Sequence, residues 1–507
     1  MFRQAKWSES LLFELSKESK ETFSVGEEFK EYYQEALSKI PEPLLRKSKP
    51  NIPDLSEIEV VRHYTRLSQM AYGVDQGPVP LGSCTMKYNP KINEELASRD
   101  ELVNLHPYLE EDDVQGLLEI MYLLQEWLAR LTGTDACSLQ PPAGAAGELV
   151  GALIIKKYLQ EAGYGNKNEM IVPESAHGTN PASAVMAGFK VVRIPADKDG
   201  NTDLEAIKAV VGDSTAGIML TNPSTLGLFE SRIVEIAELI HKANGLLYYD
   251  GANLNGILGI VRPGDMGFDI VHLNLHKTFS TPHGGGGPGG GAVCVKKHLL
   301  NYLPVPLVVK ENGKYRFKYD LPNTIGRISW FYGNIIPIVK AFLYIATLGP
   351  DIREVAEISV LNTNYFMKRV SSLKGVSLQY GEGRWRKHEV VLSFDRLHKE
   401  TGVSAEDVAK ALLDRGFHAP TIYFPLIVSE AHMVELTETE SKENIDDMIN
   451  AYSEIVQQAY EDPEKVKKTP LNTSVHRLDV LVGNHPKTYA PTYKYLDRVR
   501  SLLKNKK

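Results

Sequence analysis

The chain has 507 residues, 43% of them hydrophobic, and a formal net charge of -7 at pH 7. A chain of this length exceeds the size at which one hydrophobic core stops growing, so we expect more than one domain. Nucleic acid and anionic membranes attract clustered positive charge, and this acidic balance gives no reason to expect either as a partner.

The first hundred residues are rich in proline and charge, and we expect residues 1–113 to form an irregular N-terminal arm. Acidic residues such as Glu9, Glu14 and Glu18 do not suit a signal peptide or an acid-poor transit segment. No uninterrupted apolar run approaches the ~20 residues that a membrane-spanning helix requires.

The cysteines give a further indication of the compartment. Cys84, Cys137 and Cys294 lie far apart, and no two of them form a C-x-x-C pair. A reducing environment is the simpler interpretation. The sequence therefore predicts a cytoplasmic protein.

A regular pattern begins at residue 114. Residues 114–131 carry apolar side chains at helical spacing, and a Pro- and Gly-containing turn at 141–147 precedes a second helical stretch at 148–161. The apolar runs that follow, separated by helical segments such as 233–243, are 170–172, 191–194, 217–220, 246–249, 270–273 and 292–295. Such runs are typical of strands buried on both faces of a mostly parallel sheet. We therefore predict a large α/β domain over residues 114–330.

The pattern changes beyond Trp330. The elements expected there are a long helix over 335–373, a strand over 389–394, a helix over 404–415, a strand over 421–428 and a helix over 443–460. This order predicts a separate, smaller α+β domain over residues 331–462. The tail, residues 463–507, contains four prolines, and its pattern does not allow an element to be predicted.

Lys277 lies at the end of a predicted strand, and hydroxylated residues and a loop of seven glycines, ending at Gly291, follow it. A lysine in this place can be desolvated and held neutral. Schiff-base chemistry needs a neutral amine, because only that form attacks an aldehyde. The alternative is an ordinary surface lysine beside a flexible loop.

Asp250 directly follows the apolar run 246–249. A carboxylate at the end of a strand can pair with a protonated pyridine nitrogen, which keeps that ring an electron sink in enzymes that use pyridoxal phosphate. The alternative is an aspartate that caps a helix or a turn. The order of Asp250, a further strand and Lys277 favours the cofactor role.

Three further turns follow predicted strands or precede a helix. The turn at 143–147 offers free backbone N–H groups and a helix dipole to a phosphate, although most such turns bind nothing. His177 follows the run 170–172 and can stack on a pyridine ring, or be an ordinary loop histidine. Asn222–Thr225 is another polar turn at a strand end. Because ligands bind at the carboxyl ends of strands in open α/β sheets, we expect these turns to converge.

Several segments resemble the glycine-decarboxylase P-protein family. These segments are 80–87, 175–184, 250–255 and 274–289, with 416–421 and 437–441 extending the likeness towards the C-terminus. The resemblance covers roughly residues 60 to 450, and the chain length is similar to that of the family's separate β subunit. It implies the aspartate-aminotransferase (fold type I) fold, with a large α/β domain and a smaller α+β domain, and pyridoxal 5'-phosphate as the cofactor.

The resemblance also implies roles for single residues. Lys277 would carry the cofactor, Asp250 would pair with the pyridine nitrogen and His177 would stack on the ring. The remaining cofactor-binding residues would be Asn253, Gly144, Ala145, Thr225 and His276, and a substrate channel would be bordered by His63, Ser83, Cys84, Thr85 and the glycine loop. The partners implied are a P-protein α subunit in an α2β2 assembly, a lipoylated H-protein and glycine.

Some positions depart from the family pattern. Ala146 stands where the family usually has His or Gln, and Gly290 and Ala292 replace more usual residues. The alternatives are therefore a diverged paralogue that acts on another amino acid and a scaffold subunit with little activity. The presence of Lys277 and Asp250 favours an enzyme over a scaffold.

Other enzyme classes are less well supported. His283 and the glycines after it resemble an esterase oxyanion turn, but no G-x-S-x-G motif accompanies them. His272 and His276 are four residues apart on a predicted strand, where this spacing does not place two metal ligands as it does on a helix. The glycine loop lacks the Lys-Ser/Thr of a nucleotide-binding P-loop.

Overall fold

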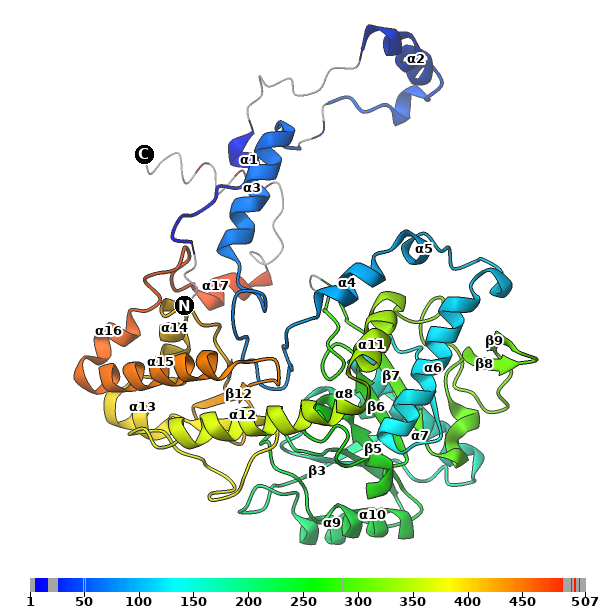
Figure 1. Ribbon diagram of the computed structural model, residues 1–507, viewed down its shortest axis with the longest axis vertical. Coiled ribbons are helices and arrows are strands. Elements are labelled where there is room, and N and C mark those ends of the chain that lie inside the picture. The colour runs from blue at the N-terminus through cyan, green and yellow to red at the C-terminus, as the bar shows by residue number, and fades with distance from the viewer. Residues whose placement is uncertain are drawn as a thin grey trace. The chain divides into compact units, whose positions relative to one another are not determined.

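The computed structural model describes residues 5–16, 26–48, 50, 52–284 and 287–486, together with residues 494, 497 and 501. The chain divides into two units. The first unit comprises residues 1–72, 413–416 and 468–507, and the second comprises residues 73–412 and 417–467. The predicted domain boundaries at 113, 330 and 462 do not coincide with the boundaries of these two units, and they stay predictions. Figure 1 draws the elements of both units.

The first unit contains helices where an irregular arm was expected. Its helices are α1 (Leu12–Leu15), α2 (Glu27–Ser38), η1 (Glu42–Leu44), α3 (Glu57–Met70) and α17 (Val480–Asn484). The backbone N–H of Ser56 donates to the Glu59 carboxylate at 2.9 Å, a contact that starts α3. The prediction of an irregular segment was wrong. These helices bury few residues, so their sequences lack the strong apolar pattern of a helix that packs on a core.

A seven-stranded sheet forms the centre of the second unit. Its order is β1 (Ala136–Ser138), β7 (Gly291–Val295), β6 (Ile270–Asn274), β5 (Leu246–Asp250), β4 (Thr215–Thr221), β2 (Glu169–Pro173) and β3 (Lys190–Ile194). Strands β3, β2, β4, β5 and β6 are parallel neighbours, whereas β7 is antiparallel to both β6 and β1. The six predicted strands all occur, and the three-residue β1 was not predicted.

Both faces of this sheet are covered by helices. One core cluster combines α6 (Gln115–Thr132), α9 (Leu204–Val210) and α10 (Ile233–Lys242) with alternate strand residues such as Tyr249. The other core cluster combines α7 (Gly144–Glu161) and α8 (Thr179–Met186) with the strand residues that point to the opposite face of the sheet, such as Tyr248. This double coverage explains why the strands read as continuous apolar runs rather than alternating ones.

A three-stranded antiparallel sheet, β10 (Glu389–Ser393), β12 (Ala431–Glu435) and β11 (Thr421–Ile422), has a separate core. The helices α12 (Glu354–Val370), α13 (Asp395–Thr401), α14 (Ala405–Asp414) and α15 (Lys442–Glu461) accompany it. The predicted strand over 421–428 was wrong beyond Ile422, since Pro425 has no N–H to donate to a ladder. The strand that continues the sheet is β12.

The helix predicted over 335–373 is two helices. α11 (Ile335–Leu348) is separated from α12 by η6 (Gly349–Arg353), where Pro350 lacks the N–H that a continuing helix needs. By length and composition alone, residues Ile335–Val370 satisfy the criteria for a membrane-spanning helix, with a mean hydropathy of 1.5. Core helices of soluble proteins satisfy the same criteria, and α11 packs on α6 and α4 (Lys91–Ala97).

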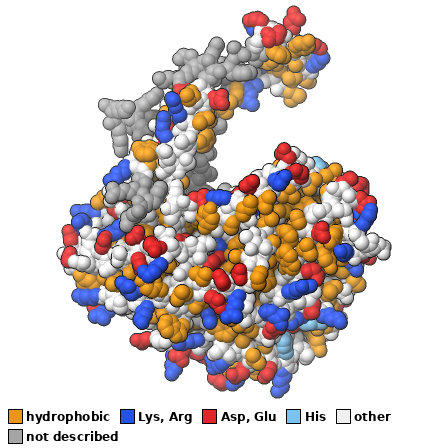
Figure 2. Space-filling model, in the orientation of Figure 1, with side chains coloured by type: hydrophobic (Ala, Val, Ile, Leu, Met, Phe, Trp, Pro, Cys, Tyr) orange, Lys and Arg blue, Asp and Glu red, His pale blue; other side chains and the backbone are white. Residues whose placement is uncertain are grey.

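The remaining elements of the second unit are short. They are α5 (Asp100–Val103), η2 (Glu111–Asp113), η3 (Gly251–Gly256), η4 (Pro263–Met266), η5 (Lys297–Tyr302), β8 (Leu307–Glu311), β9 (Lys314–Lys318) and α16 (Pro463–Lys467). Figure 2 shows basic and acidic side chains intermixed over the visible face of this unit.

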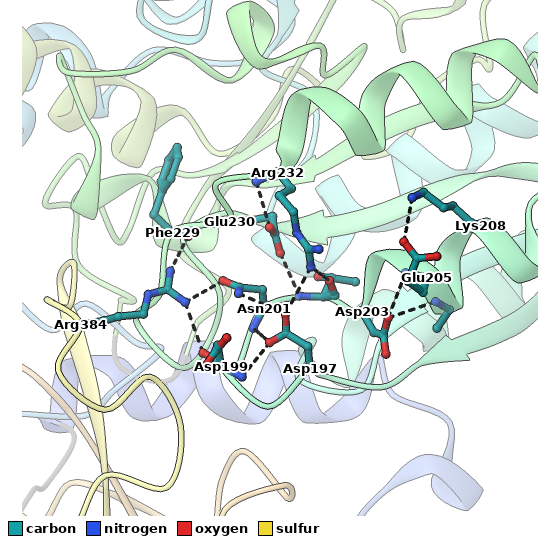
Figure 3. Close-up of polar contacts among 12 residues, drawn as sticks. Asp197, Asp199, Asn201, Asp203, Glu205, Lys208, Phe229, Glu230, Arg232 and Arg384 are labelled. Atoms are coloured by element: carbon teal, nitrogen blue, oxygen red, sulfur yellow. Dashed lines mark hydrogen bonds and ion pairs between the residues drawn. The ribbon is translucent and has the colours of Figure 1, made fainter.

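Arg384 ties the start of β10 to the large sheet (Figure 3). Its guanidinium donates to the Asn201 side chain at 2.8 Å and to the Phe229 carbonyl at 3.2 Å. The Asp197 carboxylate accepts from the backbone N–H of Asn201 at 2.9 Å, which holds the β3–α9 loop in shape. The backbone of β10 is thereby fixed beside the turn that follows β4.

Cys137 and Cys294 form a disulfide between directly paired residues of β1 and β7. The sequence analysis did not predict this pair, because 157 residues separate the two cysteines and neither strand's partner could be read from the sequence. Cys84 is a free thiol.

Candidate active site

Polar residues gather where β4, β5 and β6 end. Asp250 is the last residue of β5, Thr221 the last of β4 and Asn274 the last of β6, and Lys277 follows Asn274 by three residues. These strands are parallel, so their carboxyl ends meet at one edge of the sheet. Asp250 is fully buried and Lys277 is 9% exposed.

The Asp250 carboxylate is held by three donors. Asn180 Nδ2 donates at 2.8 Å, Thr221 Oγ1 at 3.3 Å and the Ala252 backbone N–H at 3.0 Å, while His272 Nε2 lies 3.5 Å away. Burial alone would raise the pKa of Asp250, but His272, His177 and Lys277, with the Ala252 N–H, lower it below its usual value. Asp250 is therefore an ionised carboxylate inside the protein, able to pair with a cationic ring nitrogen.

The Lys277 side chain is only 9% exposed, and its amine has no hydrogen-bond partner among the residues that the structure describes. It lies within electrostatic reach of Asp250, His276 and Cys84. A buried amine costs free energy when it is unpaired. The arrangement is suited to an amine that forms a covalent bond with a ligand.

His177 lies in the loop between β2 and α8. Its Nε2 hydrogen-bonds Ser83 Oγ, and its ring centroid is 5.4 Å from that of Phe424. Burial lowers the pKa of His177, and Lys277 lowers it further while Asp250 opposes the change. The ring is therefore neutral near pH 7, and its stacking on a cofactor stays a prediction.

The first turn of α7 is suited to a phosphate. The Ala143 side chain does not cap this helix, so the N–H groups of its first turn are left for another acceptor. A Cβ on Gly144 would lie 1.8 Å from Asn274 Nδ2, so glycine is required where the helix start meets β6. Ala145 is exposed on this turn.

Thr225 and His276, the other predicted phosphate residues, are buried. The Thr225 hydroxyl donates to the Ser175 carbonyl. His276 Nδ1 lies 3.0 Å from the Gly290 carbonyl oxygen, and burial, with His283 and Lys277, lowers the pKa of His276 to about 3. The neutral ring has one N–H, which Nδ1 donates to the Gly290 carbonyl, so Nε2 is left as an acceptor.

The predicted channel residues Ser83, Cys84 and Thr85 are attached to the smaller sheet. Leu81 forms a β-bridge with Val434 of β12, and the loop that contains Ser83, Cys84 and Thr85 follows Leu81. The backbone N–H of Ser83 donates to Glu389 at 2.8 Å and that of Thr85 donates to Glu435 at 2.9 Å. Asn253 Nδ2 donates to the Pro223 carbonyl at 2.9 Å and to Glu389 Oε1 at 3.2 Å.

Two predicted channel components are not placed at the site. His63 belongs to the first unit, where its Nδ1 lies 3.1 Å from Glu9 Oε1, and its channel role stays a prediction. Within the seven-glycine loop, Gly285 and Gly286 lie outside the described residues.

The sequence analysis missed several residues that lie at this edge. One of them is Glu148 in α7, whose pKa is raised to about 9 by burial and by Asp250, against the opposing effect of Lys277. Its position four residues after Gly144 on one helix face is the signal that could have identified it. Lys87, also missed, pairs with Glu438 at 2.6 Å and donates to Asn255 at 2.8 Å and to the Thr278 carbonyl at 3.0 Å.

Comparison with known sequences gives consistent matches. The family described as "Glycine cleavage system P-protein" matches residues 26–318, and that described as "Glycine dehydrogenase, C-terminal domain" matches residues 355–476. The chain is 55% identical to a probable glycine dehydrogenase (decarboxylating) subunit 2 of Staphylothermus marinus, over 98% of this chain and 99% of the relative. It is 57% identical to the protein of the same description from Pyrococcus furiosus, over 98% of each chain.

Solved structures match the fold. A glycine decarboxylase (P-protein) of the glycine cleavage system, in inhibitor-bound form, superposes with a TM-score of 0.69 at 22% identity, over 86% of this chain and 99% of that chain. A glutamate decarboxylase from Lactobacillus brevis gives a TM-score of 0.62 at 15% identity, over 82% and 95%. The predicted aspartate-aminotransferase-like fold of type I is thus confirmed.

Proposed function

Because this chain belongs to the glycine cleavage system P-protein family, we propose that it decarboxylates glycine with pyridoxal phosphate and passes the aminomethyl group to the lipoyl arm of an H-protein. Full-length likeness to relatives described as glycine dehydrogenase (decarboxylating) subunit 2 supports the reaction class. The single observation that carries the cofactor assignment is the buried Lys277 amine, without a hydrogen-bond partner among the described residues, at the same sheet edge as ionised Asp250.

The residues present fit pyridoxal phosphate. Lys277 would hold it covalently, Asp250 would pair with its ring nitrogen and His177 would stack on its ring. The phosphate would lie at the first turn of α7, where the close approach of Gly144 to Asn274 leaves no room for a side chain. The further cofactor contacts that we propose are Ala145, Thr225, His276 and Asn253.

When bound, pyridoxal phosphate accepts into its protonated ring the electron pair left by loss of CO2. The chain's own residues supply the conditions for this. Ionised Asp250 favours a proton on the ring nitrogen, and Asn180 and Thr221 orient its carboxylate. Burial of the strand ends excludes water, which strengthens every charge interaction in the site. We propose that Ser83, Cys84 and Thr85 border the space in which glycine meets the lipoyl arm.

We propose that the chain works with a second subunit in an α2β2 assembly, and that it acts in the cytoplasm. The description of its relatives as "subunit 2" supports a partner subunit. The rival proposal, a paralogue that acts on another amino acid, predicts activity with that amino acid in place of glycine.

Borohydride reduction tests the cofactor assignment. Treatment of the wild-type chain with pyridoxal phosphate and borohydride should attach the cofactor to Lys277, detected by peptide mass spectrometry. Lys277→Ala should abolish this attachment and the exchange of labelled bicarbonate into glycine, because it removes the amine that is proposed to form the link. Exposed Lys297 provides the control, and Lys297→Ala should behave as wild type. Normal bicarbonate exchange in Lys277→Ala would refute the assignment.

A further inference from the structure

Two buried glutamates face each other across the smaller sheet. Glu389 of β10 and Glu435 of β12 are directly paired in the antiparallel register, and their exposed fractions are 0% and 2%. Directly opposed like charges destabilise a sheet, and burial of two ionised carboxylates together costs far more. A pair in this position needs a proton or a cation between its oxygens.

The contacts of the pair satisfy only part of its hydrogen-bonding capacity. Glu389 accepts from the Ser83 backbone and from Asn253 Nδ2, and Glu435 Oε2 accepts from the Thr85 backbone. Glu435 Oε1 has no hydrogen-bond partner among the described residues, and the same is true of both ring nitrogens of fully buried His388. One polar atom from each of these three side chains lies within 4.8 Å of the other two.

The pair belongs to the active-site side of the sheet. Two of its donors connect it to the candidate site. Ser83 contacts His177, and Asn253 follows Asp250 by three residues. The charged and titratable groups that face the pair are Lys277, Lys87, Cys84 and His388. The pair therefore interacts electrostatically with both the free thiol of Cys84 and the amine proposed to hold the cofactor.

The electrostatics favour one retained proton. Burial, with the charge of Glu435, raises the pKa of Glu389 well above its ordinary value, although Lys277 opposes the rise. Burial raises the pKa of Glu435 to about 7, against the lowering effect of its Thr85 contacts. Burial, Lys277 and Lys87 lower the pKa of His388 to about 3, so this ring is neutral and does not supply the missing positive charge.

We propose that Glu389 and Glu435 share one proton and act together as the acid of this active site. This role rests on the proposed function, whose overall reaction consumes one proton. The aminomethyl carbon forms a bond to one sulfur of the lipoyl disulfide, and the sulfur–sulfur bond breaks. The other sulfur leaves with the electron pair and takes the proton from the pair. The two carboxylates then regain a proton from water.

The shared proton is tested without glycine chemistry. The full chain, loaded with pyridoxal phosphate and labelled with 13C at glutamate side-chain carboxyls, is titrated by NMR or infrared spectroscopy. The wild type should retain a protonated carboxyl at neutral pH. Glu435→Gln should lower the apparent pKa of the remaining carboxyl by about one unit or more, because the like charge is gone. The control Glu230→Gln replaces a buried glutamate that accepts from the backbone of Thr202 and Arg232, and it should leave the signal of the pair unchanged.

The acid role is tested on a lipoylated H-protein in a single turnover. Glu389→Gln and Glu435→Gln should each slow the appearance of the free thiol roughly 100-fold or more, which is the usual contribution of general acid catalysis. Borohydride attachment of the cofactor at Lys277 should remain at the wild-type level in both variants, which separates an acid from a structural role. Equal losses of cofactor attachment and thiol formation would overturn the proposal.

Two other outcomes would also overturn it. Two ionised carboxylates at neutral pH in the wild type, with a metal ion found by elemental analysis, would show that a cation occupies the pair. A wild-type chain that titrates as expected but releases no thiol with glycine and its partner subunit would refute the proposed function, and with it the acid role. The first outcome leaves the proposed function intact, so the two failures are distinguishable.

Discussion

Two carboxyl groups in the site have opposite protonation states because their neighbours differ. Asp250 and Glu148 each place an oxygen within 4.8 Å of the other and of a His272 nitrogen. Asp250 receives three hydrogen-bond donors, whereas Glu148 Oε2 has no partner among the described residues. His272, His177 and Lys277, with the Ala252 N–H, lower the pKa of Asp250, whereas burial and the charge of Asp250 raise the pKa of Glu148 to about 9. Because the two pKa values lie far apart, Asp250 is charged and Glu148 is protonated at neutral pH.

Replacement of Glu148 by glutamine should change how stability depends on pH. The folded pKa of Glu148, about 9, lies above the ordinary value of about 4.3, so the folded chain binds the extra proton between these limits. The contribution of Glu148 to the free energy of unfolding is thus fully present at low pH and is lost as pH rises through this window. Glu148→Gln removes the titration.

Urea unfolding of the cofactor-free chain provides the measurement. The stability of Glu148→Gln relative to wild type should increase by up to about 1.4 kcal/mol per pH unit between about pH 5 and about pH 8. The control Glu161→Gln alters the last residue of the same helix, away from Asp250, and should show no such trend. Parallel pH profiles for Glu148→Gln and wild type would contradict the assignment of a neutral Glu148.

Candidate site residues were identifiable from the sequence where they lie at the end of an apolar strand or within a few residues after it. Asp250 and Lys277 belong to this group, and the structure places them at one sheet edge in the predicted order. Glu389 and Glu435 were not predicted as a pair, because their proximity depends on the register of two distant strands. A five-residue strand such as β12, with two polar residues in it, gives too weak a pattern to be found.

At the scale of elements, the start of α7 meets the end of β6 without room for a side chain. Gly144→Ala would place a Cβ 1.8 Å from Asn274 Nδ2, so the helix start or Asn274 must move. We expect the affinity for pyridoxal phosphate to fall about tenfold or more, because the N–H groups that would hold the phosphate move with the helix. Absorbance titration with the cofactor measures this.

Gly116 provides the matched control, since it also lies in the first turn of a helix, α6, but a Cβ there would meet nothing within 4 Å. Gly116→Ala should keep the wild-type cofactor affinity and gain up to about 1 kcal/mol of stability, through lower backbone entropy of the unfolded chain. Equal cofactor affinities for both variants would show that the start of α7 does not bind the phosphate.

The disulfide links the edge strand β1 to β7. Cys137→Ser should lower the free energy of unfolding by about 2–5 kcal/mol, since the bond closes a long loop in the unfolded chain. Denatured, unreduced wild type should show one reactive thiol, that of Cys84, and reduced protein three. Cys84→Ser keeps the disulfide and should unfold at nearly the wild-type denaturant concentration. Three reactive thiols before reduction would contradict the bond.

At the scale of the whole molecule, the first unit has an apolar stripe on α3 that is exposed within that unit. On α3, Ile58, Val61 and Tyr64 recur every three residues, and each is more than half exposed. Monomeric proteins seldom expose contiguous apolar surface of this kind. The sequence analysis predicted an irregular arm here, and helical spacing alone would not say what covers the face of a helix. A partner subunit, proposed above, would provide the cover.

Substitution on this stripe tests that arrangement in the assembled protein. Val61→Glu places a charge in the middle of the stripe, and it should weaken association with the partner subunit about tenfold or more, since an uncompensated charge would be buried. Arg62→Glu changes the charge of the neighbouring exposed residue by a larger amount but lies off the stripe, so it should associate nearly as wild type. Analytical ultracentrifugation of each variant with the partner gives both affinities. If the two variants associate equally well, the partner binds elsewhere, and the partner does not cover the apolar stripe of α3.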